Sequence, residues 1–389
     1  MTMIKSLLPS GCYDLLPPHA RQESEVSYNL LSVFESFGYE QVSPPLLEYS
    51  DSLLSGRGNS LSSQIFRVID PTANRVMGIR PDITLQIARI AVTRMNHSPR
   101  PLRLCYNGLI LRMQGEQLKS DRQLHQAGIE LIGAATAEAD AEIILIAAEA
   151  LKKVGIKKIS IDLNLPSIVS SLLAAEKFEE AELQILLNAI AHKDISVIKN
   201  ISFSYRDTLI GLLQNSGAAE QVLGNIERLE LPDRARRQCA DLRQVVEILR
   251  RHNNPDWNIT IDATENRGAA YHSGISFSIF VDGVACEVGC GGRYKIDGEN
   301  SKHDLEATGF TLYVETLLDI LPQAERAKRI LISVGISDVS ASELRDKGFT
   351  TVYALTEYGN CTMEAKRLGC GYLYKDNEII ELNETKEEK

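Results

Sequence analysis

The chain has 389 residues, which is too long for one compact core, so we expect two or three domains. Hydrophobic residues make up 44% and charged residues 24% of the sequence, as in an ordinary globular protein rather than a fibrous, disordered or membrane-spanning chain. The formal net charge of −10 argues mildly against a nucleic-acid-binding protein, which needs a basic face.

Apolar runs and cysteines indicate the compartment. The longest apolar runs, such as residues 143–148, are far shorter than the ~20 residues of a membrane span. Residues 6–11 interrupt the N-terminus too early for the apolar core of a signal peptide. The seven cysteines show no disulfide spacing, and Cys286 and Cys290 have no second pair or nearby histidine with which to hold zinc. We therefore expect a cytoplasmic protein without a bound metal or cofactor.

The first third of the chain mixes helix and strand. A helix is predicted over residues 20–37 and ends at Gly38, and the strand that follows ends near Pro44 and Pro45. Two strands within residues 102–133 are joined by a polar loop at about 113–121. A long Ala-rich helix is predicted over 136–154, followed by a short strand, KKISIDLN.

The middle of the chain has a different composition from the first third. Residues from about 166 to 254 are rich in Ala, Leu, Glu, Gln and Arg without strand alternation, which predicts an all-helical insertion. The arginines of 228–251 alternate with acidic residues, so we interpret them as a solvated, salt-bridged helix surface rather than a nucleic-acid site. Strands return in NITIDAT, ISFSIFV and VACEVGC, and Asp282-Gly283 predicts a type I′ hairpin between the last two.

The end of the chain completes the predicted architecture. The apolar spacing of ATGFTLYVETLL (residues 307–318) predicts an amphipathic helix whose one charge, Glu315, is followed by Thr316. Beyond residue 326, short strand and helix patterns alternate. The sequence therefore predicts an α+β fold, with a body over 1–325 that contains the insertion 166–254, and a small α/β domain over 326–389.

One cluster of polar residues lies in GIRPDITLQIAR. Pro81 favours an extended Arg80, so a helix should begin around Thr84. Asp82 and Thr84 would then lie at a strand-to-helix corner, where short polar side chains often cap the helix. From these residues alone, plain capping is the simpler interpretation.

A second cluster lies on the predicted strand HQAGIELIG. Because alternate residues of a strand share a face, Gln126, Gly128 and Glu130 should align, with Glu130 as the acceptor of a slot suited to an ammonium or imidazolium group. Arg112, which ends the preceding strand, can grip a carboxylate or phosphate with two hydrogen bonds. An ordinary solvated sheet face is the alternative interpretation.

Two further clusters come later. ENRGAAYHSGISF supplies a cation, Arg267, and two ring side chains, Tyr271 and His272, but nothing nearby completes a catalytic triad. In GCGGRYKIDG, residues 289–298, the glycines permit close backbone approach to a ligand. This segment follows a predicted strand but opens no helix and lacks P-loop spacing, so neither a dinucleotide nor a P-loop interpretation applies.

Taken in order, these features resemble a known fold. Pro44-Pro45 after a helix, the arginine loop between two strands, and the Gly-Phe segment near residue 309 resemble the three motifs of class II aminoacyl-tRNA synthetases. RPDIT, HQAGIELIG, RGAAYH and GGRY narrow the resemblance to the histidyl-tRNA synthetase lineage, over about residues 8–320. The resemblance implies an antiparallel sheet flanked by helices.

The resemblance also implies a histidine pocket with assigned contacts. The α-ammonium group would be held by Asp82, Thr84 and Gln126, the imidazole by Glu130, and the carboxylate by Arg112 and Arg267. Tyr271, His272 and Tyr294 would line the ring pocket. The chain departs from the synthetase at His272, which replaces a second tyrosine, and at Asp82, which is shorter than the family's glutamate.

The ATP half of the synthetase site is less well kept. Arg112 is followed by Met113 and Gln114, so the carboxylate that reads adenine two residues later is lost. Thr316 stands where the arginine that grips the triphosphate belongs, and adenylation needs positive charge on the phosphates. The C-terminal part is also shorter than the usual anticodon-binding domain.

A histidine-binding synthetase body with these losses resembles the regulatory subunits of ATP phosphoribosyltransferase. That resemblance implies a chain without chemistry of its own, which supports a short catalytic subunit in the first step of histidine biosynthesis and transmits feedback inhibition by histidine. The short subunit condenses ATP with phosphoribosyl pyrophosphate to give phosphoribosyl-ATP and pyrophosphate. The expected assembly is a homodimer of this chain within a hetero-octamer, without tRNA or membrane.

Two other functions stay open on the sequence. A true histidyl-tRNA synthetase would need Glu116 or Lys119 to replace the missing ATP contacts. A free-standing histidine sensor, or a paralogue that modifies another protein with an amino acid, would act on some other partner.

Overall fold

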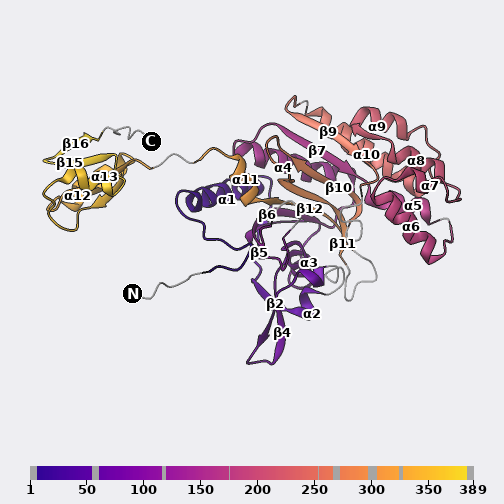
Figure 1. Cartoon of the computed structure of the whole chain (residues 1–389), viewed down its shortest axis with the longest axis horizontal. Coiled ribbons are helices and arrows are strands. Elements are labelled where there is room, and N and C mark those ends of the chain that lie inside the picture. The colour runs from indigo at the N-terminus through magenta and orange to yellow at the C-terminus, as the bar shows by residue number, and fades with distance from the viewer. Residues whose placement is uncertain are drawn as a thin grey trace. The chain divides into compact units, whose positions relative to one another are not determined.

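The computed structural model describes residues 7–54, 61–115, 120–174, 176–252, 254–265, 272–296, 305–323 and 327–382. The chain forms two compact units, Met1–Pro322 and Gln323–Lys389. Figure 1 labels their helices and strands. In the described part of the chain, no helix has the length and apolar character to cross a membrane.

A nine-stranded sheet is the centre of the larger unit, with the order β1-β5-β6-β12-β11-β10-β7-β9-β8. Its strands are β1 (Glu40–Gln41), β5 (Leu102–Leu111), β6 (Gln123–Ile132), β7 (Ile159–Asn164), β8 (Ser216–Ala218), β9 (Trp257–Asp262), β10 (His272–Phe280), β11 (Gly289–Ile296) and β12 (Leu305–Tyr313). Neighbouring strands are antiparallel, except that β1 pairs with β5 and β7 with β9 in parallel. The predicted α+β class, with an antiparallel sheet, is confirmed.

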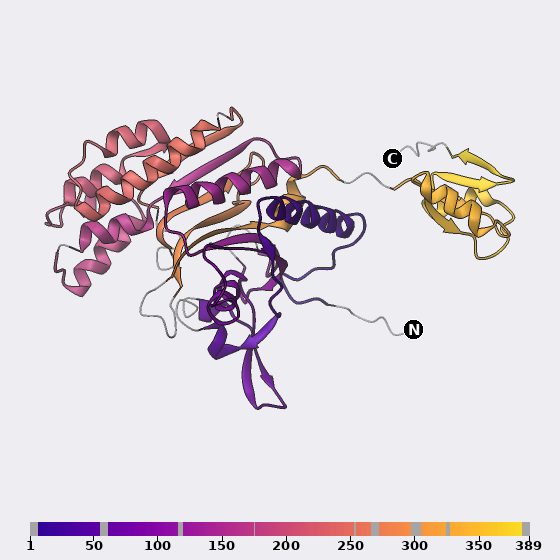
Figure 2. The same ribbon diagram turned by 180° about the vertical axis from the view of Figure 1, so that it is seen from behind.

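Helices cover one face of this sheet. The helices α1 (His19–Ser36) and α4 (Ala137–Lys153) pack on each other and on the central strands, as Figure 2 shows. On β6, Ala127, Ile129 and Leu131 point into this core. Because side chains alternate along a strand, Gln126 and Glu130 lie on the opposite face. The predicted alternation of β6 therefore places its polar residues away from the main core.

The insertion predicted to be all helical is helical except for one short strand. It contains α5 (Pro166–Leu173), α6 (Glu180–Ala191), α7 (Ile195–Ile198), α8 (Arg206–Leu213), α9 (Ala219–Ile226) and α10 (Asp233–Arg251), with the short strand β8 at the sheet edge. Arginines of α10 pair with carboxylates as the alternating charges predicted. Arg236 lies 3.9 Å from Asp233, and Arg243 lies 2.5 Å from Glu227.

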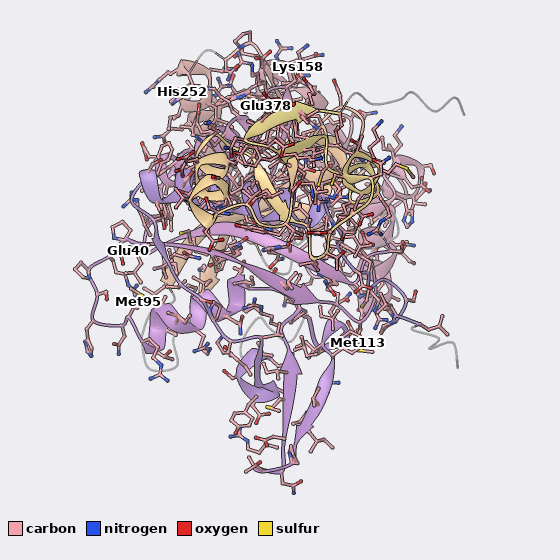
Figure 3. All side chains as sticks on the ribbon, turned by 90° about the vertical axis from the view of Figure 1, so that its left-hand side faces the viewer. Glu40, Met95, Met113, Lys158, His252 and Glu378 are labelled. Atoms are coloured by element: carbon pink, nitrogen blue, oxygen red, sulfur yellow. The ribbon has the colours of Figure 1, made fainter. Side chains whose placement is uncertain are left out.

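A second, three-stranded sheet was not predicted. It has the order β2-β4-β3, from β2 (Leu47–Tyr49), β3 (Arg67–Asp70) and β4 (Arg75–Ile79), with the short helix α2 (Ser50–Leu53) beside it. Figure 3 shows it projecting from the larger sheet. Arg80 connects the two sheets, because its buried guanidinium donates to the carbonyl of Leu109 at 2.7 Å and to that of Pro44 at 2.9 Å. Helix α3 (Thr84–Thr93) follows.

The smaller unit alternates strand and helix as predicted. Its elements are β13 (Arg329–Ile332), α12 (Asp338–Asp346), β14 (Thr350–Tyr353), α13 (Cys361–Arg367), β15 (Tyr372–Lys375) and β16 (Glu378–Glu381). The sheet order is β14-β13-β15-β16; the first three strands are parallel and β16 is antiparallel.

The predicted type I′ hairpin at Asp282-Gly283 is wrong. β10 ends at Phe280 and β11 begins at Gly289, and only Gly283 of the pair has positive φ (95°), whereas a type I′ turn needs it at both positions. A type I′ geometry occurs instead between β15 and β16, where Asp376 and Asn377 have φ of 52° and 65°. Asp-Gly favours a tight turn, but the connection between β10 and β11 is longer than the two-residue loop of a type I′ hairpin.

Two further predictions need correction. GCGGRYKI was expected to follow a strand, but it is the strand β11 itself, and a Cβ at Gly291 would lie 2.2 Å from the Gly309 carbonyl oxygen on β12. The segment 307–313, predicted as helix, belongs to β12, and α11 (Val314–Ile320) begins after it. Both strands are central and buried on both faces, so their apolar pattern does not alternate and periodicity fails to separate strand from helix.

Candidate functional site

The predicted polar residues meet on the sheet face opposite α1 and α4. Gln126 and Glu130 come from β6, in the centre of the sheet, and both are fully buried. The strand β6 pairs with β12 on one side and with β5 on the other. The N-terminus of α3 closes the site above them, because Gln126 bonds to that corner directly. The site is therefore held by regular elements rather than by a free loop.

Asp82, Thr84 and Gln126 form one hydrogen-bonded corner. The Asp82 Oδ1 atom accepts from the backbone N–H of Thr84 at 2.8 Å, as the capping interpretation predicted. Gln126 joins this corner to β6, because its Nε2 donates to Asp82 Oδ2 at 2.9 Å and its Oε1 accepts from the backbone N–H of Ile83 at 3.1 Å. Capping and pocket formation are thus two effects of the same contacts.

Glu130 is the most deeply buried acid of the site, with 1% of its surface exposed. Its Oε2 accepts a hydrogen bond from the Tyr294 hydroxyl at 2.8 Å. Burial raises the pKa of Glu130 to about 8, and the charge of Asp82 adds to the rise, while hydrogen bonds from Tyr294 and Thr84 oppose it. A cation placed next to this carboxyl would favour its ionised form, so the site is suited to a positively charged group.

Two glycines make room for these side chains. A Cβ at Gly309 would lie 2.0 Å from Glu130 Oε2, so β12 must have a glycine at that position. A Cβ at Gly128 would lie 2.5 Å from the Tyr106 hydroxyl. The sequence suggested an open slot beside Gly128. In the structure, the Tyr106 side chain occupies that space.

Tyr106 is a site residue that the sequence interpretation missed. It lies on β5 directly opposite Gly128, is fully buried, and its hydroxyl lies 2.7 Å from Thr311 Oγ1 and 3.4 Å from Thr84 Oγ1. Burial raises its pKa well above the ordinary value, so it stays a neutral hydroxyl. A large residue opposite a glycine on paired strands was the available signal, but it depends on the exact strand register.

Arg112 lies at the edge of the same face. Its backbone N–H bonds to the Arg122 carbonyl at 2.8 Å, and its Nε donates to the Pro81 carbonyl at 3.4 Å, beside the Asp82 corner. Its charge opposes the rise that burial gives to the pKa values of Cys290 and Tyr313, so the guanidinium faces those buried groups as well. The position suits an anionic group of a ligand bound at the corner.

His272 and Tyr294 face each other across β10 and β11 in paired register. A Cβ at Gly292 would lie 2.9 Å from His272 Nδ1, so the imidazole lies over that glycine. The Tyr294 hydroxyl donates a hydrogen bond to Glu130 Oε2. The remaining predicted contacts, Arg267 and Tyr271, lie outside the described residues.

The first turn of α11 carries no cation. Glu315 and Thr316 are both buried, and Glu315 Oε2 accepts from the His125 backbone N–H at 2.9 Å, which fixes the start of β6 to α11. Glu116 and Lys119, the alternative ATP contacts, lie outside the described residues. Within the part of the chain that the structure covers, no group of three His, Cys, Asp or Glu residues is arranged to hold a metal ion.

Comparisons of the sequence with known proteins show which family the chain resembles. The family model of histidyl-tRNA synthetase matches residues 11–317. The chain is 41% identical to the ATP phosphoribosyltransferase regulatory subunit of Rhodospirillum centenum, over 97% of both chains. It is 40% identical to the protein of that name from Paramagnetospirillum magneticum, over 97% of this chain and 98% of the relative.

Solved structures share the fold. A Bacillus halodurans protein described as an ATP phosphoribosyltransferase regulatory subunit/histidyl-tRNA synthetase has a TM-score of 0.79 at 21% identity, covering 94% of this chain and 97% of its own. The histidyl-tRNA synthetase of Nostoc has a TM-score of 0.77 at 19% identity, covering 97% and 95%.

Fold and site together define a protein of the class II aminoacyl-tRNA synthetase type, in its histidyl branch. Within that branch, the chain belongs to the family of ATP phosphoribosyltransferase regulatory subunits.

Proposed function

We propose that this chain is the non-catalytic regulatory subunit of ATP phosphoribosyltransferase, acting with a short catalytic subunit in the first step of histidine biosynthesis. One observation carries the proposal. The described residues of the proposed amino-acid pocket include buried, mutually bonded polar groups, whereas the first turn of α11 has the neutral Thr316 in place of a phosphate-binding cation.

Histidine is the proposed effector, and the inherited pocket is its proposed site. The Asp82 corner offers a carboxylate, an amide and a hydroxyl for an α-ammonium group, and Arg112 lies beside that corner for the α-carboxylate. Glu130, with Tyr294 bonded to it, is placed for the imidazole. Buried, preorganised polar groups of this kind select a ligand that satisfies all of them.

The lost cation supports a regulatory rather than a catalytic role. Aminoacyl adenylation places negative charge on the phosphates in the transition state, and loss of a single preorganised hydrogen-bond donor at a developing charge already costs about 2.7–4 kcal/mol in a known enzyme. Glu315 cannot substitute in phosphate binding, because it is an acidic side chain that would repel a phosphate; its Oε2 accepts from the His125 backbone N–H. The activity would then reside in the catalytic partner.

Regulation requires a coupling free energy between the subunits. Histidine must bind the active and inhibited states of the complex with different affinity, typically by 1–3 kcal/mol. A homodimer of this chain within a hetero-octamer is the assembly that we propose, with no tRNA bound.

The pocket is tested by calorimetric titration of the full chain with histidine. Glu130→Gln keeps the shape but cannot ionise beside a cationic ligand, so we expect at least a tenfold loss of affinity, as for a charge-assisted contact worth about 1.5–3 kcal/mol. Asp162→Asn is the matched control, because Asp162 lies on β7, which β12, β11 and β10 separate from β6 in the sheet, and its carboxylate is bonded to Thr260 at 2.8 Å.

Unchanged histidine affinity in Glu130→Gln would move the effector site elsewhere. Histidine-dependent exchange of pyrophosphate into ATP by the purified chain would contradict the non-catalytic role and favour the synthetase alternative.

A further inference from the structure

A second cavity opens on the other side of the sheet. It is a groove of about 420 Å³ between α10 and the ends of β10, β11 and β12, and we refer to it as the α10 groove. Its charged and hydroxyl lining consists of Arg234, Arg237, Asp241, Ser273, Lys295 and Glu306. The volume is within the range of small-molecule sites.

The α10 groove and the proposed histidine site around Glu130 lie on opposite faces of the sheet at β11. Tyr294 points to Glu130, whereas the preceding residue, Arg293, points the other way and bonds to Asp140 of α4 at 2.6 Å. Arg293 also lies 3.8 Å from Asp241 of α10, in the wall of the groove. The groove is therefore separate from the proposed histidine site.

The carboxylates of the groove already have partners. Glu306 lies 3.5 Å from Lys295 and accepts a hydrogen bond from Ser273 at 3.1 Å. Asp241 faces Arg293. These contacts leave hydrogen-bond capacity on both carboxylates, but their charge is partly balanced from within the sheet.

The two arginines that line the groove differ from its carboxylates, which already have partners. Arg234 and Arg237 are exposed, lie about one helical turn apart on α10, and make no hydrogen bond or ion pair with any residue that the structure describes. Other arginines of this helix, Arg236 and Arg243, have carboxylate partners. The uncompensated charge of the groove is thus positive and concentrated on two guanidinium groups.

We propose that the α10 groove binds a small phosphate ester of a polyhydroxy compound, such as a sugar phosphate or a nucleotide. Two adjacent guanidinium groups match the oxygens of a phosphate, and Arg is the residue best suited to such a fork. Asp241 and Glu306 accept hydrogen bonds from the ligand's hydroxyl groups, and Ser273, which donates to Glu306, adds a hydroxyl to the lining.

A long polyanion fits this groove less well. An extended nucleic acid would meet the same two carboxylates and a chain whose formal net charge is −10. A ligand with one phosphate and several hydroxyl groups satisfies both kinds of lining. The inference concerns this chain alone, so it does not depend on the proposed regulatory function.

Calorimetric titration of the full chain tests the groove. The probes are ribose 5-phosphate and AMP, with ribose and adenosine as unphosphorylated counterparts. We expect saturable binding of at least one phosphorylated probe and none of its counterpart. The double variant Arg234→Gln/Arg237→Gln should raise the Kd of that probe at least tenfold.

The matched control is Arg228→Gln/Arg251→Gln, which removes the same charge from exposed arginines near the two ends of α10 and outside the groove. It should keep the Kd within a factor of two, and circular dichroism checks that both double variants fold. The proposal is overturned if neither phosphorylated probe binds at millimolar concentration, if both double variants weaken binding equally, or if neither weakens it. Binding of single-stranded RNA in preference to both probes would also overturn it.

Discussion

At the scale of single residues, the buried carboxyl of Glu130 sets the charge of the proposed histidine site. It is 1% exposed, and burial raises its pKa to about 8, so the carboxyl is mostly protonated at neutral pH without a ligand. Its partner Tyr294 holds it in place while its charge state is free to respond to a cation. The site therefore combines a fixed geometry with a variable charge.

This raised pKa predicts a pH dependence of stability. In the unfolded chain the carboxyl titrates near 4.5, and in the folded chain near 8, so between these values the folded state holds more protons. The free energy of unfolding should therefore fall as pH rises from about 4.5 to about 8, and level off above that. We expect Glu130→Gln to lose this component, so that the variant gains on the wild-type chain as pH rises through this window.

Urea unfolding at a series of pH values measures the difference, with Glu40→Gln as the control for removal of an exposed carboxylate elsewhere on the sheet. A stability difference between wild type and Glu130→Gln that stays constant from pH 5 to pH 8 would contradict the assigned burial of the charge.

Residue-scale sequence interpretation succeeded where alternation alone decides the answer. The shared face of Gln126 and Glu130 follows from the period of a strand, and the structure has it. Tyr106 was missed because its place beside Gly128 depends on the register between β5 and β6, which no local pattern specifies.

At the scale of elements, glycines in β11 and β12 let the central strands and the site coexist. Gly291 allows β11 to approach the Gly309 carbonyl, and Gly309 leaves room for Glu130. In sequence, these glycines suggested close backbone approach to a ligand after a strand, and the start of a helix. Central strands that are buried on both faces lack the alternation that identifies strands, so only the sheet order corrects both predictions.

Gly309→Ala should be strongly destabilising. The added Cβ would lie 2.0 Å from Glu130 Oε2 and 2.5 Å from the Ile129 carbonyl oxygen, and a backbone neighbour cannot move aside cheaply. We expect a loss of about 1–3 kcal/mol in the free energy of unfolding, the usual cost of overpacking, together with loss of histidine binding.

Gly224→Ala is the control for this substitution. Gly224 lies in α9, and a Cβ there would meet nothing within 4 Å, so the change should be neutral or stabilise the helix by up to about 1 kcal/mol. Denaturant unfolding compares the two variants. Equal stabilities of Gly309→Ala and Gly224→Ala would contradict the packing of β12 against Glu130.

At the scale of the whole molecule, the chain combines a synthetase-like unit with a small α/β unit. The order of the three motifs along the sequence was enough to predict the larger fold, because each motif marks an element of the nine-stranded sheet. The projecting sheet β2-β4-β3 was not predicted, since its strands are short and many of their side chains are exposed.

The most direct test of the proposed function is phosphoribosyl-ATP formation by the short catalytic subunit from the same genome. The assay is run with and without this chain, across a titration of histidine. We expect this chain to stimulate the reaction and histidine to reverse the stimulation. No stimulation, together with no complex between the two chains, would contradict the regulatory role.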